Sequence, residues 1–392
     1  MVSSINSKNN QPRAMWVIFF ASIITFMSLT LVDPILPTIA NQLGATPSQV
    51  TLLFTTYFAA MGVSMLITGA VSTRLGIKRT MLAGAIIIAA CSTLCGLSNN
   101  VWMINTIRGF WGIGNALFVA TALTSIILLS VNHVSKAVIL YEAAIGLGVS
   151  TGPLIGGLLG EISWRYPFLG VGFLMIIASV FLFISMPTVQ ESEKIIKKTS
   201  LKDPFRAMKN HKIMILGITA ALYNFGFFTL LAYSPFIIGL DAHGIGLVFI
   251  GWGILVALAS VFIAPRLRQR YGLIKPMGTI LIIFAIVLLV MGIYTSTQWI
   301  IIVSIIFSGV LIGSNNTLIT TAVMQATTIE RSTVSAAYSF LRFVGAAIAP
   351  YLAGVLAVLY SPHIPFIVGG CFVFGSAIFL LLNRHQVESI II

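Results

Sequence analysis

Long runs of apolar residues, separated by short polar stretches, organise this sequence from one end to the other. Each run is about as long as the roughly 20 residues that an α-helix needs to cross the hydrocarbon core of a bilayer. The first run, from Met15, is too long for the apolar part of a signal peptide, so it is predicted to be a membrane helix. The twelve predicted membrane helices cover residues 15–39, 50–72, 79–98, 101–129, 136–160, 164–186, 213–238, 244–265, 275–294, 297–323, 333–358 and 362–383.

One long polar stretch, residues 187–212, divides these helices into six and six. We therefore expect an N-terminal half (residues 1–186), a cytoplasmic linker (187–212) and a C-terminal half (213–392). The halves echo each other, because the run GVSTGPLIGG from Gly148 returns as GAAIAPYLAG from Gly345. The loop sequence RLG at Arg74 likewise returns as RYG at Arg270. The predicted fold is an all-α membrane protein of two six-helix pseudo-repeats.

The composition supports a membrane protein and leaves no room for a soluble enzyme domain. Hydrophobic residues make up 58% of the chain and charged residues 8%, whereas soluble proteins carry roughly 25% charged residues. All five histidines fall in predicted loops or tails, and the three cysteines lie in apolar runs without acidic or histidine neighbours. We therefore expect no enzyme activity, no metal site and no cofactor. A phosphate-binding loop is absent from the sequence, so ATP-driven transport is not expected.

The net charge of +13 reflects membrane topology rather than a nucleic-acid partner. Of the 22 Lys and Arg residues, 19 fall in the two tails and in the loops on the same side of the membrane. The positive-inside rule then predicts cytoplasmic N- and C-termini for a multi-pass protein of the plasma (inner) membrane. Only Arg165 lies in a loop on the other side, while Arg108 and Arg342 lie within helices. The Lys-rich central loop is expected to contact anionic lipid headgroups.

Four segments combine small residues, prolines and charges in recognisable patterns. The 2–3 loop reads GAVSTRLGIKRTML from Gly69, helix 4 reads RGFWGIGN from Arg108, helix 5 carries the glycine run from Gly148, and helix 1 ends with LVDPILP around Asp33. We expect the small residues of helix 5 to let the two halves pack closely, and Pro153 to bend this helix where one hydrogen bond is missing. Taken in their order along the chain, these segments resemble the motifs of the major facilitator superfamily, and within it those of the 12-helix drug:proton antiporters.

The resemblance implies roles for the matching residues. The 2–3 loop is similar to the cytoplasmic signature G-x-L-a-D-r-x-G-r-k, with Thr73 where relatives carry an acidic gate residue. Helix 4 is similar to R-x-x-q-G-x-g, with Trp111 in the usual Gln place. Helix 5 is similar to G-x-x-x-G-P-x-x-G-G, which in the family separates exporters from importers; generic tight packing is the alternative. The gating and packing residues so identified are Gly69, Arg74, Gly76, Lys78, Gly112, Gly148, Gly152, Pro153, Gly156 and Gly157.

Asp33 and Glu142 are the two acids inside the predicted helices, and each is a candidate for proton coupling. Counted along their helices, Asp33 and Arg108 both lie about 10 Å below the outer surface. The resemblance places helices 1 and 4 on a common cavity, so the two side chains could pair and exchange a proton as Arg108 moves. A permanent buried salt bridge is the alternative. Glu142 could carry a second proton, recognise a cation, or extend to the inner interface.

Candidate substrate-binding residues are aromatic or polar side chains on helices predicted to face the cavity: Trp111, Asn115, Tyr223, Asn224 and Arg342. Apolar walls with a few polar groups suit amphipathic ligands. Arg342 could bind an anionic substrate group or neutralise Glu142. The alternative for each aromatic residue is a packing or lipid-facing role.

We therefore predict a proton-coupled secondary active exporter of small amphipathic compounds that works by alternating access and resembles multidrug efflux proteins. The alternatives are a dedicated metabolite or siderophore exporter, a lipid flippase, or an uptake symporter of the same fold. The expected partners are a small-molecule substrate, protons and membrane lipids. Nucleic acid is not an expected partner, and the protein is predicted to be a monomer.

Overall fold

The computed structural model describes residues 3–129, 134–186, 200, 202–327, 329 and 331–388. Over these residues it is built from helices without a strand, and twelve helical segments are long and apolar enough to cross a membrane. This confirms the predicted fold class. It makes the protein a multi-pass membrane protein.

The six spans of the N-terminal half follow the predicted order. The first consists of three consecutive pieces, α1 (Ser3–Thr30), η1 (Asp33–Ile35) and α2 (Leu36–Leu43). The next five are α3 (Pro47–Leu75), α4 (Ile77–Leu97), α5 (Val101–Leu129), α6 (Val134–Ile162) and α7 (Arg165–Ser185). Thr46 begins α3 with a capping box, since its side chain accepts from the Gln49 N–H at 3.3 Å and Gln49 Oε1 accepts from the Thr46 N–H at 2.9 Å.

The C-terminal half repeats this arrangement. Its spans are α9 (His211–Ile237), then α10 (Ala242–Leu258) continued by a π-helical segment η3 (Ala259–Ile263) and α11 (Ala264–Tyr271), then α12 (Ile274–Ile293), α13 (Gln298–Gln325), α14 (Arg331–Leu359) and α15 (Ile364–Leu382). Two short helices, α8 (Asp203–Met208) and α16 (Arg384–Glu388), flank this half. Most of the predicted linker lies outside the described residues, and α8 packs against α14 and α9.

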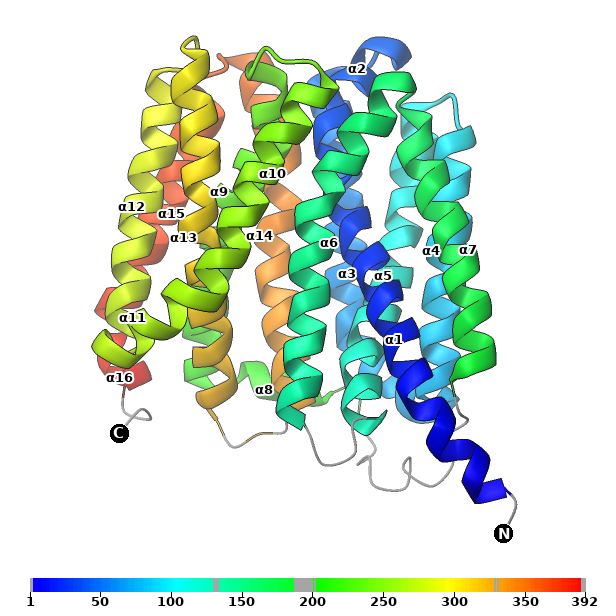
Figure 1. The fold of residues 1–392 in the computed structure, drawn as a ribbon. Coiled ribbons are helices and arrows are strands. Elements are labelled where there is room, and N and C mark those ends of the chain that lie inside the picture. The colour runs from blue at the N-terminus through cyan, green and yellow to red at the C-terminus, as the bar shows by residue number, and fades with distance from the viewer. Residues whose placement is uncertain are drawn as a thin grey trace.

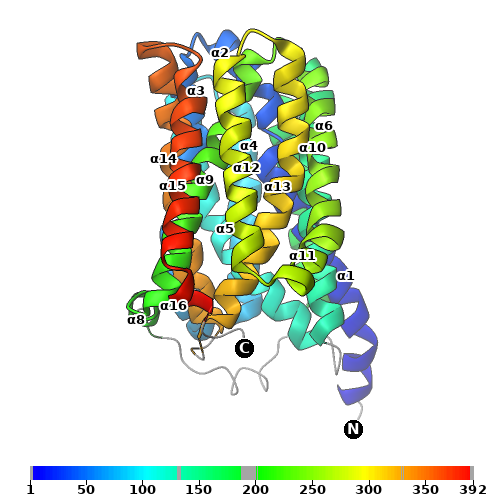
Figure 2. The ribbon, with the colours of Figure 1, turned by 90° about the vertical axis from the view of Figure 1, so that its left-hand side faces the viewer.

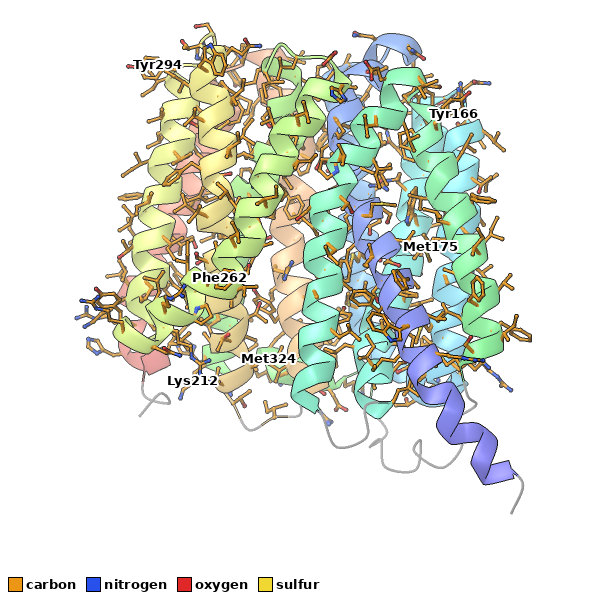
Figure 3. The ribbon with its side chains drawn as sticks, in the orientation of Figure 1. Tyr166, Met175, Lys212, Phe262, Tyr294 and Met324 are labelled. Atoms are coloured by element: carbon orange, nitrogen blue, oxygen red, sulfur yellow. The ribbon has the colours of Figure 1, made fainter. Side chains whose placement is uncertain are left out.

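The helices stand side by side, with the first turn of α1 and α16 at one end of the bundle and α2 at the other (Figures 1 and 2). We call these the terminal end and the far end. Exposed Tyr166 and Tyr294 lie at the far end, and Lys212 lies at the terminal end (Figure 3). Aromatic side chains at the ends of apolar spans are typical of residues at a membrane interface.

Matched glycines show that the two halves are structural repeats. A Cβ on Gly148 of α6 would lie 2.6 Å from the Ile23 carbonyl oxygen of α1, and a Cβ on Gly345 of α14 would overlap the Ala221 backbone of α9. In the same way, Gly157 approaches Ala242 of α10 while Gly354 approaches Ser48 of α3. The repeated sequence motif therefore makes equivalent contacts in both halves.

Two pairs of helices make most of the contacts between the halves, since α3 packs on α14 and α6 packs on α10. The approaches of Gly354 to Ser48 and of Gly157 to Ala242 place part of these contacts at the far end. A Cβ on Gly246 would be 2.7 Å from the Pro153 carbonyl oxygen, and one on Gly253 would be 2.8 Å from the Ser150 Cα atom. The turn η1 also contacts α9 and α10. Small residues thus allow the halves to close tightly at the far end.

Candidate functional site

Asp33 lies in a break of the first span. Pro34 and Pro37 cannot donate backbone hydrogen bonds, and α1 ends at Thr30 before the 3₁₀ turn that begins at Asp33. The predicted loosening of helix 1 by these prolines is confirmed. The Asp33 side chain is completely buried, and neither carboxyl oxygen has a hydrogen-bond partner among the described residues. Because η1 packs on α6, α9 and α10, this acid lies where the two halves meet.

The glycines of α6 hold this broken helix in place. A Cβ on Gly152 would lie 2.7 Å from the Met27 carbonyl oxygen, and one on Gly156 would lie 2.8 Å from the Leu31 carbonyl carbon. The Thr30 hydroxyl also donates to the Val149 carbonyl at 3.1 Å. We expected the whole motif to pack the two halves together, but Gly148, Gly152 and Gly156 instead face α1 of the same half.

Two members of the motif do reach the other half. Gly157 approaches α10, and the Pro153 carbonyl lies against Gly246 of α10. The four-residue spacing of Gly148, Gly152 and Gly156 puts them on one face of α6, and Gly157 is turned by one residue to the neighbouring face. One helix therefore contacts both the segment that carries Asp33 and the opposite half.

Arg108 of α5 is completely buried between two aromatic rings. Its guanidinium carbon lies 4.6 Å from the centroid of the Tyr57 ring and 4.6 Å from that of Trp111. Cation–π contacts of this kind stabilise a cation away from water. None of its three side-chain nitrogens has a hydrogen-bond partner in the described part of the chain. Asn115, one of the predicted residues, donates its amide to the Tyr57 hydroxyl, while Gly112 allows α5 to approach the backbone at Tyr57.

Asp33 and Arg108 do not form an ion pair in this state. They lie within range of each other's charge, yet the described residues contain only one ion pair, between Arg206 and Asp203. A salt bridge that persists throughout the transport cycle would be present here as well. The arrangement therefore leaves both side chains available for new partners. The side chain of Glu142, the other predicted proton site, lies outside the described residues.

The predicted polar residues of the C-terminal half gather around α9, α13 and α14. Tyr223 and Asn224 are buried on α9, and Arg342 is partly exposed on α14. Asn224 donates to the Ala220 carbonyl of its own helix at 2.8 Å. The Tyr223 hydroxyl has no geometrically suitable partner among the described residues, although the Asn315 amide lies next to it.

Aromatic residues connect Arg108 with Arg342 across the two halves. Tyr57 packs edge-on against Phe58 with ring centroids 5.2 Å apart, and Phe58 stacks on Phe343 at 5.7 Å. Arg342 lies 5.1 Å from the Phe343 ring. Phe58 also packs on Phe228 of α9 at 4.4 Å. We call Tyr57, Phe58, Phe228 and Phe343 the aromatic bridge.

The sequence did not single out Tyr57, Phe58, Phe343 or Tyr338. Aromatic residues are common in membrane helices, and one sequence gives no signal for which face of a helix meets another helix. The only available cue was position, since Phe343 follows Arg342 directly.

The 2–3 loop makes a tight turn at the terminal end. Gly76 adopts φ +84°, a conformation that residues with a Cβ rarely take, and its N–H donates to the Ser72 carbonyl at 3.0 Å. Lys78 donates to the Met186 carbonyl at the end of α7. Thr73 donates to the Ala70 carbonyl of its own helix at 3.0 Å. The Thr73 hydroxyl, at the position where relatives carry an acid, therefore bonds within its own helix, and Arg74 is exposed.

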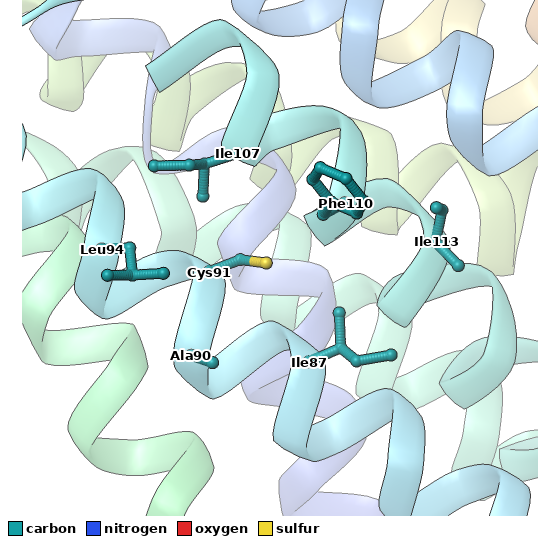
Figure 4. Close-up of a pocket in the computed structure, with 7 residues that line it drawn as sticks. All are labelled: Ile87, Ala90, Cys91, Leu94, Ile107, Phe110 and Ile113. Atoms are coloured by element: carbon teal, nitrogen blue, oxygen red, sulfur yellow. The ribbon is translucent and has the colours of Figure 1, made fainter. Parts of the chain in front are cut away.

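An apolar crevice lies between α4 and α5. It has a volume of about 300 Å³ and is lined by Ile87, Ala90, Cys91, Leu94, Ile107, Phe110 and Ile113 (Figure 4). The exposed side chains of Leu94 and Phe110 at its edge show that it opens on the outside of the bundle. It carries no charged group and is distinct from Asp33 and the aromatic bridge. Within the described residues, His, Cys, Asp and Glu form no cluster that could hold a metal.

In the described part of the chain, twelve spans form two repeated halves, and a buried acid without a partner there lies in a broken first span; this arrangement is typical of a polytopic transporter. The family model of the Major Facilitator Superfamily matches residues 18–243 and 236–390. The chain therefore belongs to the Major Facilitator Superfamily.

Two relatives from Bacillus subtilis carry names that describe drug export. The chain is 45% identical over 391 residues to "Multidrug efflux protein YfmO", which covers 99% of this chain and 98% of that protein. It is 28% identical over 260 residues to "Multidrug resistance protein 1", covering 64% of this chain and 65% of that protein.

Solved structures share the fold at low identity. The D-xylose-proton symporter has a TM-score of 0.78 over 94% of this chain and 96% of its own, at 14% identity. The human organic anion transporter MFSD10 (TETRAN) has a TM-score of 0.71 over 94% and 99%, at 15% identity. These likenesses concern the fold alone.

Proposed function

We propose that this protein is a proton-coupled exporter of small amphipathic compounds, with Asp33 as the proton-carrying group. The observation that carries the proposal is the buried Asp33 carboxyl group, unpartnered among the described residues, in the break between α1 and α2. An acid inside a membrane span is expensive unless it has a function. The name of the relative at 45% identity, a multidrug efflux protein, supports export of drug-like molecules.

Asp33 is neutral when it carries a proton, and a neutral carboxyl group suits the closed, buried environment found here. An unpaired carboxylate would be strongly disfavoured in that environment. When the terminal end opens, water reaches the break between α1 and α2, and Asp33 can release its proton to the cytoplasmic side. Arg108 then stabilises the carboxylate, because its guanidinium is nearby and has no hydrogen-bond partner among the described residues. Once the far end has opened, a proton from the outer side would neutralise Asp33, release Arg108 and return the protein to the closed state, so that each cycle carries one proton inward.

The contacts of α6 suggest how this step reaches the other half. Gly152 and Gly156 of α6 pack against the first span directly before Asp33, whereas Gly157 of α6 packs against α10. A shift of the turn η1 therefore moves a helix that is packed against the opposite half. Alternating access would follow if the contacts at the far end open while the terminal end closes.

The topology belongs to the same proposal. Exposed cations at the terminal end, among them Arg74, Arg79, Arg266 and Arg270, favour a cytoplasmic position for both termini. The linker 187–212 would then join the halves 1–186 and 213–392 on the cytoplasmic side of the plasma membrane. Lipid headgroups would contact these cations, and a single chain would hold a complete pathway as a monomer.

Efflux from energised cells tests the proposal. The probes are ethidium, a lipophilic cation, and N-phenyl-1-naphthylamine, a neutral aromatic amine, each measured with and without a protonophore. We expect protonophore-sensitive efflux by the wild-type protein and its loss in Asp33→Asn. The matched control is Asp241→Asn, which keeps an acceptor for the Gly244 N–H at the start of α10 and should retain efflux. Uphill efflux by Asp33→Asn would refute the role of Asp33, and efflux of neither probe by any variant would refute export of such compounds.

A further inference from the structure

Arg342 is a cation within a membrane span that has no acidic partner among the described residues. Its guanidinium carbon lies 5.8 Å from the Tyr338 ring and 5.1 Å from the Phe343 ring, and its buried Nε atom lacks a hydrogen-bond partner there. The one ion pair of the described residues lies elsewhere, on α8. Unlike Arg108, Arg342 is partly exposed, so a molecule can reach it. A cation at this depth without an acidic partner among the described residues indicates a site for an anion.

Neutral hydrogen-bonding groups from two other helices converge near Arg342. The Tyr223 hydroxyl from α9 and both polar atoms of the Asn315 amide from α13 are buried and unpartnered in the described part of the chain. Tyr223 lies within range of the Arg342 charge and next to Asn315, and the Tyr338 hydroxyl lies beside Arg342 and Thr320. Buried polar groups are normally hydrogen-bonded, so several unpartnered groups around one cation point to a ligand.

The aromatic bridge supplies an apolar surface beside this cation. Phe343, adjacent to Arg342, stacks on Phe58 of the other half at 5.7 Å, and Phe58 packs on Phe228 at 4.4 Å. Flat rings favour an aromatic ligand body over a flexible alkyl chain. The described spans offer no comparable site to a cationic ligand. Of their two acids, Asp33 is fully buried and assigned to the proton, and Glu161 is exposed in the last turn of α6.

We propose that Arg342, Tyr223 and Asn315 bind the anionic group of an aromatic amphiphile, such as an aryl carboxylate or sulfonate, whose ring system packs on the aromatic bridge. This inference rests on the proposed export function and gives it a substrate class. The positive charge of Arg342 and the donors around it select the anionic group. The bridge, which contains residues of both halves, makes the site complete only when the halves meet.

A matched pair of fluorescent probes tests this site. The sulfonate 8-anilinonaphthalene-1-sulfonate and the neutral N-phenyl-1-naphthylamine share one ring system and differ by the anionic group. Binding of each is measured at equilibrium to the full chain in lipid nanodiscs, with protein-free nanodiscs subtracted. We expect Arg342→Gln to weaken binding of the sulfonate about tenfold and to change binding of the neutral amine less than about twofold, because a charge-assisted contact is lost. Arg206→Gln, which removes an exposed arginine from α8, should change neither.

Two further variants keep the test decisive. Arg342→Lys should retain most of the sulfonate preference, and Tyr223→Phe should weaken sulfonate binding about threefold through loss of one hydroxyl donor. These variants also serve if Arg342→Gln does not fold. An unchanged ratio of sulfonate to amine affinity in Arg342→Gln, or in Tyr223→Phe if Arg342→Gln does not fold, would overturn the proposal. Equal loss of both probes would also overturn it. Because no proton gradient is applied, failure of proton coupling would leave these affinities intact and would be recognised separately in the efflux assay.

Discussion

The two halves share one helical plan but bury different chemistry. In the N-terminal half, Gly152 and Gly156 bring α6 against a first span that breaks before Asp33. The matching positions of the C-terminal half carry Ala349 and Ala353, both buried, and the first span of this half, α9, stays helical to Ile237 in spite of Pro235.

The charges differ in the same way. The N-terminal half buries Asp33 and Arg108 completely, whereas the C-terminal half surrounds a partly exposed Arg342 with neutral Tyr223 and Asn315. Duplication thus gave two equal scaffolds, and the substitutions within them separate the proposed proton site from the proposed ligand site. The comparison predicts that variants in the first half affect transport of every substrate, while variants in the second affect selected substrates.

The largest effect is expected for Gly152→Leu. A leucine side chain would overlap the α1 backbone, where even a Cβ would lie 2.7 Å from the Met27 carbonyl oxygen. Overpacking against backbone destabilises by about 1–3 kcal/mol or more, so we expect loss of efflux or of the folded protein. Gly146→Leu is the matched control on the same helix, since a Cβ there meets nothing within 4 Å. Efflux assays with protein quantified in the membrane measure both, and normal transport by Gly152→Leu would contradict the packing described for α6.

Arg108→Ala should abolish efflux of neutral and charged probes alike. It removes the cation that Asp33 requires and empties the space between Tyr57 and Trp111. Arg342→Gln should instead lower sulfonate export about tenfold and spare the neutral amine. Parallel efflux of both probes distinguishes the two arginines. A selective defect in Arg108→Ala would remove the functional contrast between the halves.

Asn115→Ala should have a smaller effect, mainly on stability. It leaves the buried Tyr57 hydroxyl without its donor, which costs about 1–2 kcal/mol. Asn224→Ala removes only a bond from the Asn224 amide to its own helix and should cost about 0.5 kcal/mol. Thermal unfolding of the purified variants would rank them, and the opposite order would show that the Asn115–Tyr57 contact contributes little.

The smallest effect is expected at the 2–3 loop. Lys78→Gln weakens a contact between the Lys78 ammonium group and the Met186 carbonyl, at the partly exposed end of α4. We expect a loss of about 0.5 kcal/mol in stability and little change in efflux. A complete loss of transport would mean that this loop gates the pathway even without an acid at Thr73.

The sequence predicts the architecture well because lipid as a solvent imposes a simple pattern. The twelve apolar runs predict the twelve spans. The glycine motif that recurs at Gly148 and Gly345 predicts the repeated halves, and the prolines after Asp33 predict the break in the first span. What the sequence could not predict is which neighbour each face meets. Gly148, Gly152 and Gly156 face α1 rather than the other half, and Arg108 lies against Tyr57, a contact between residues far apart in the chain. Such contacts depend on helix rotation, which apolar runs do not specify.

Transport by purified protein in proteoliposomes tests the role of Asp33 most directly. The measurement compares uphill transport driven by an imposed pH gradient with exchange of labelled for unlabelled substrate at equal pH, using the probe that wild type exports fastest. The account predicts that Asp33→Asn loses uphill transport completely and keeps exchange within about twofold of wild type, because exchange through a permanently neutral side chain needs no proton. Uphill transport by Asp33→Asn that still follows the pH gradient would contradict it and place the proton site elsewhere.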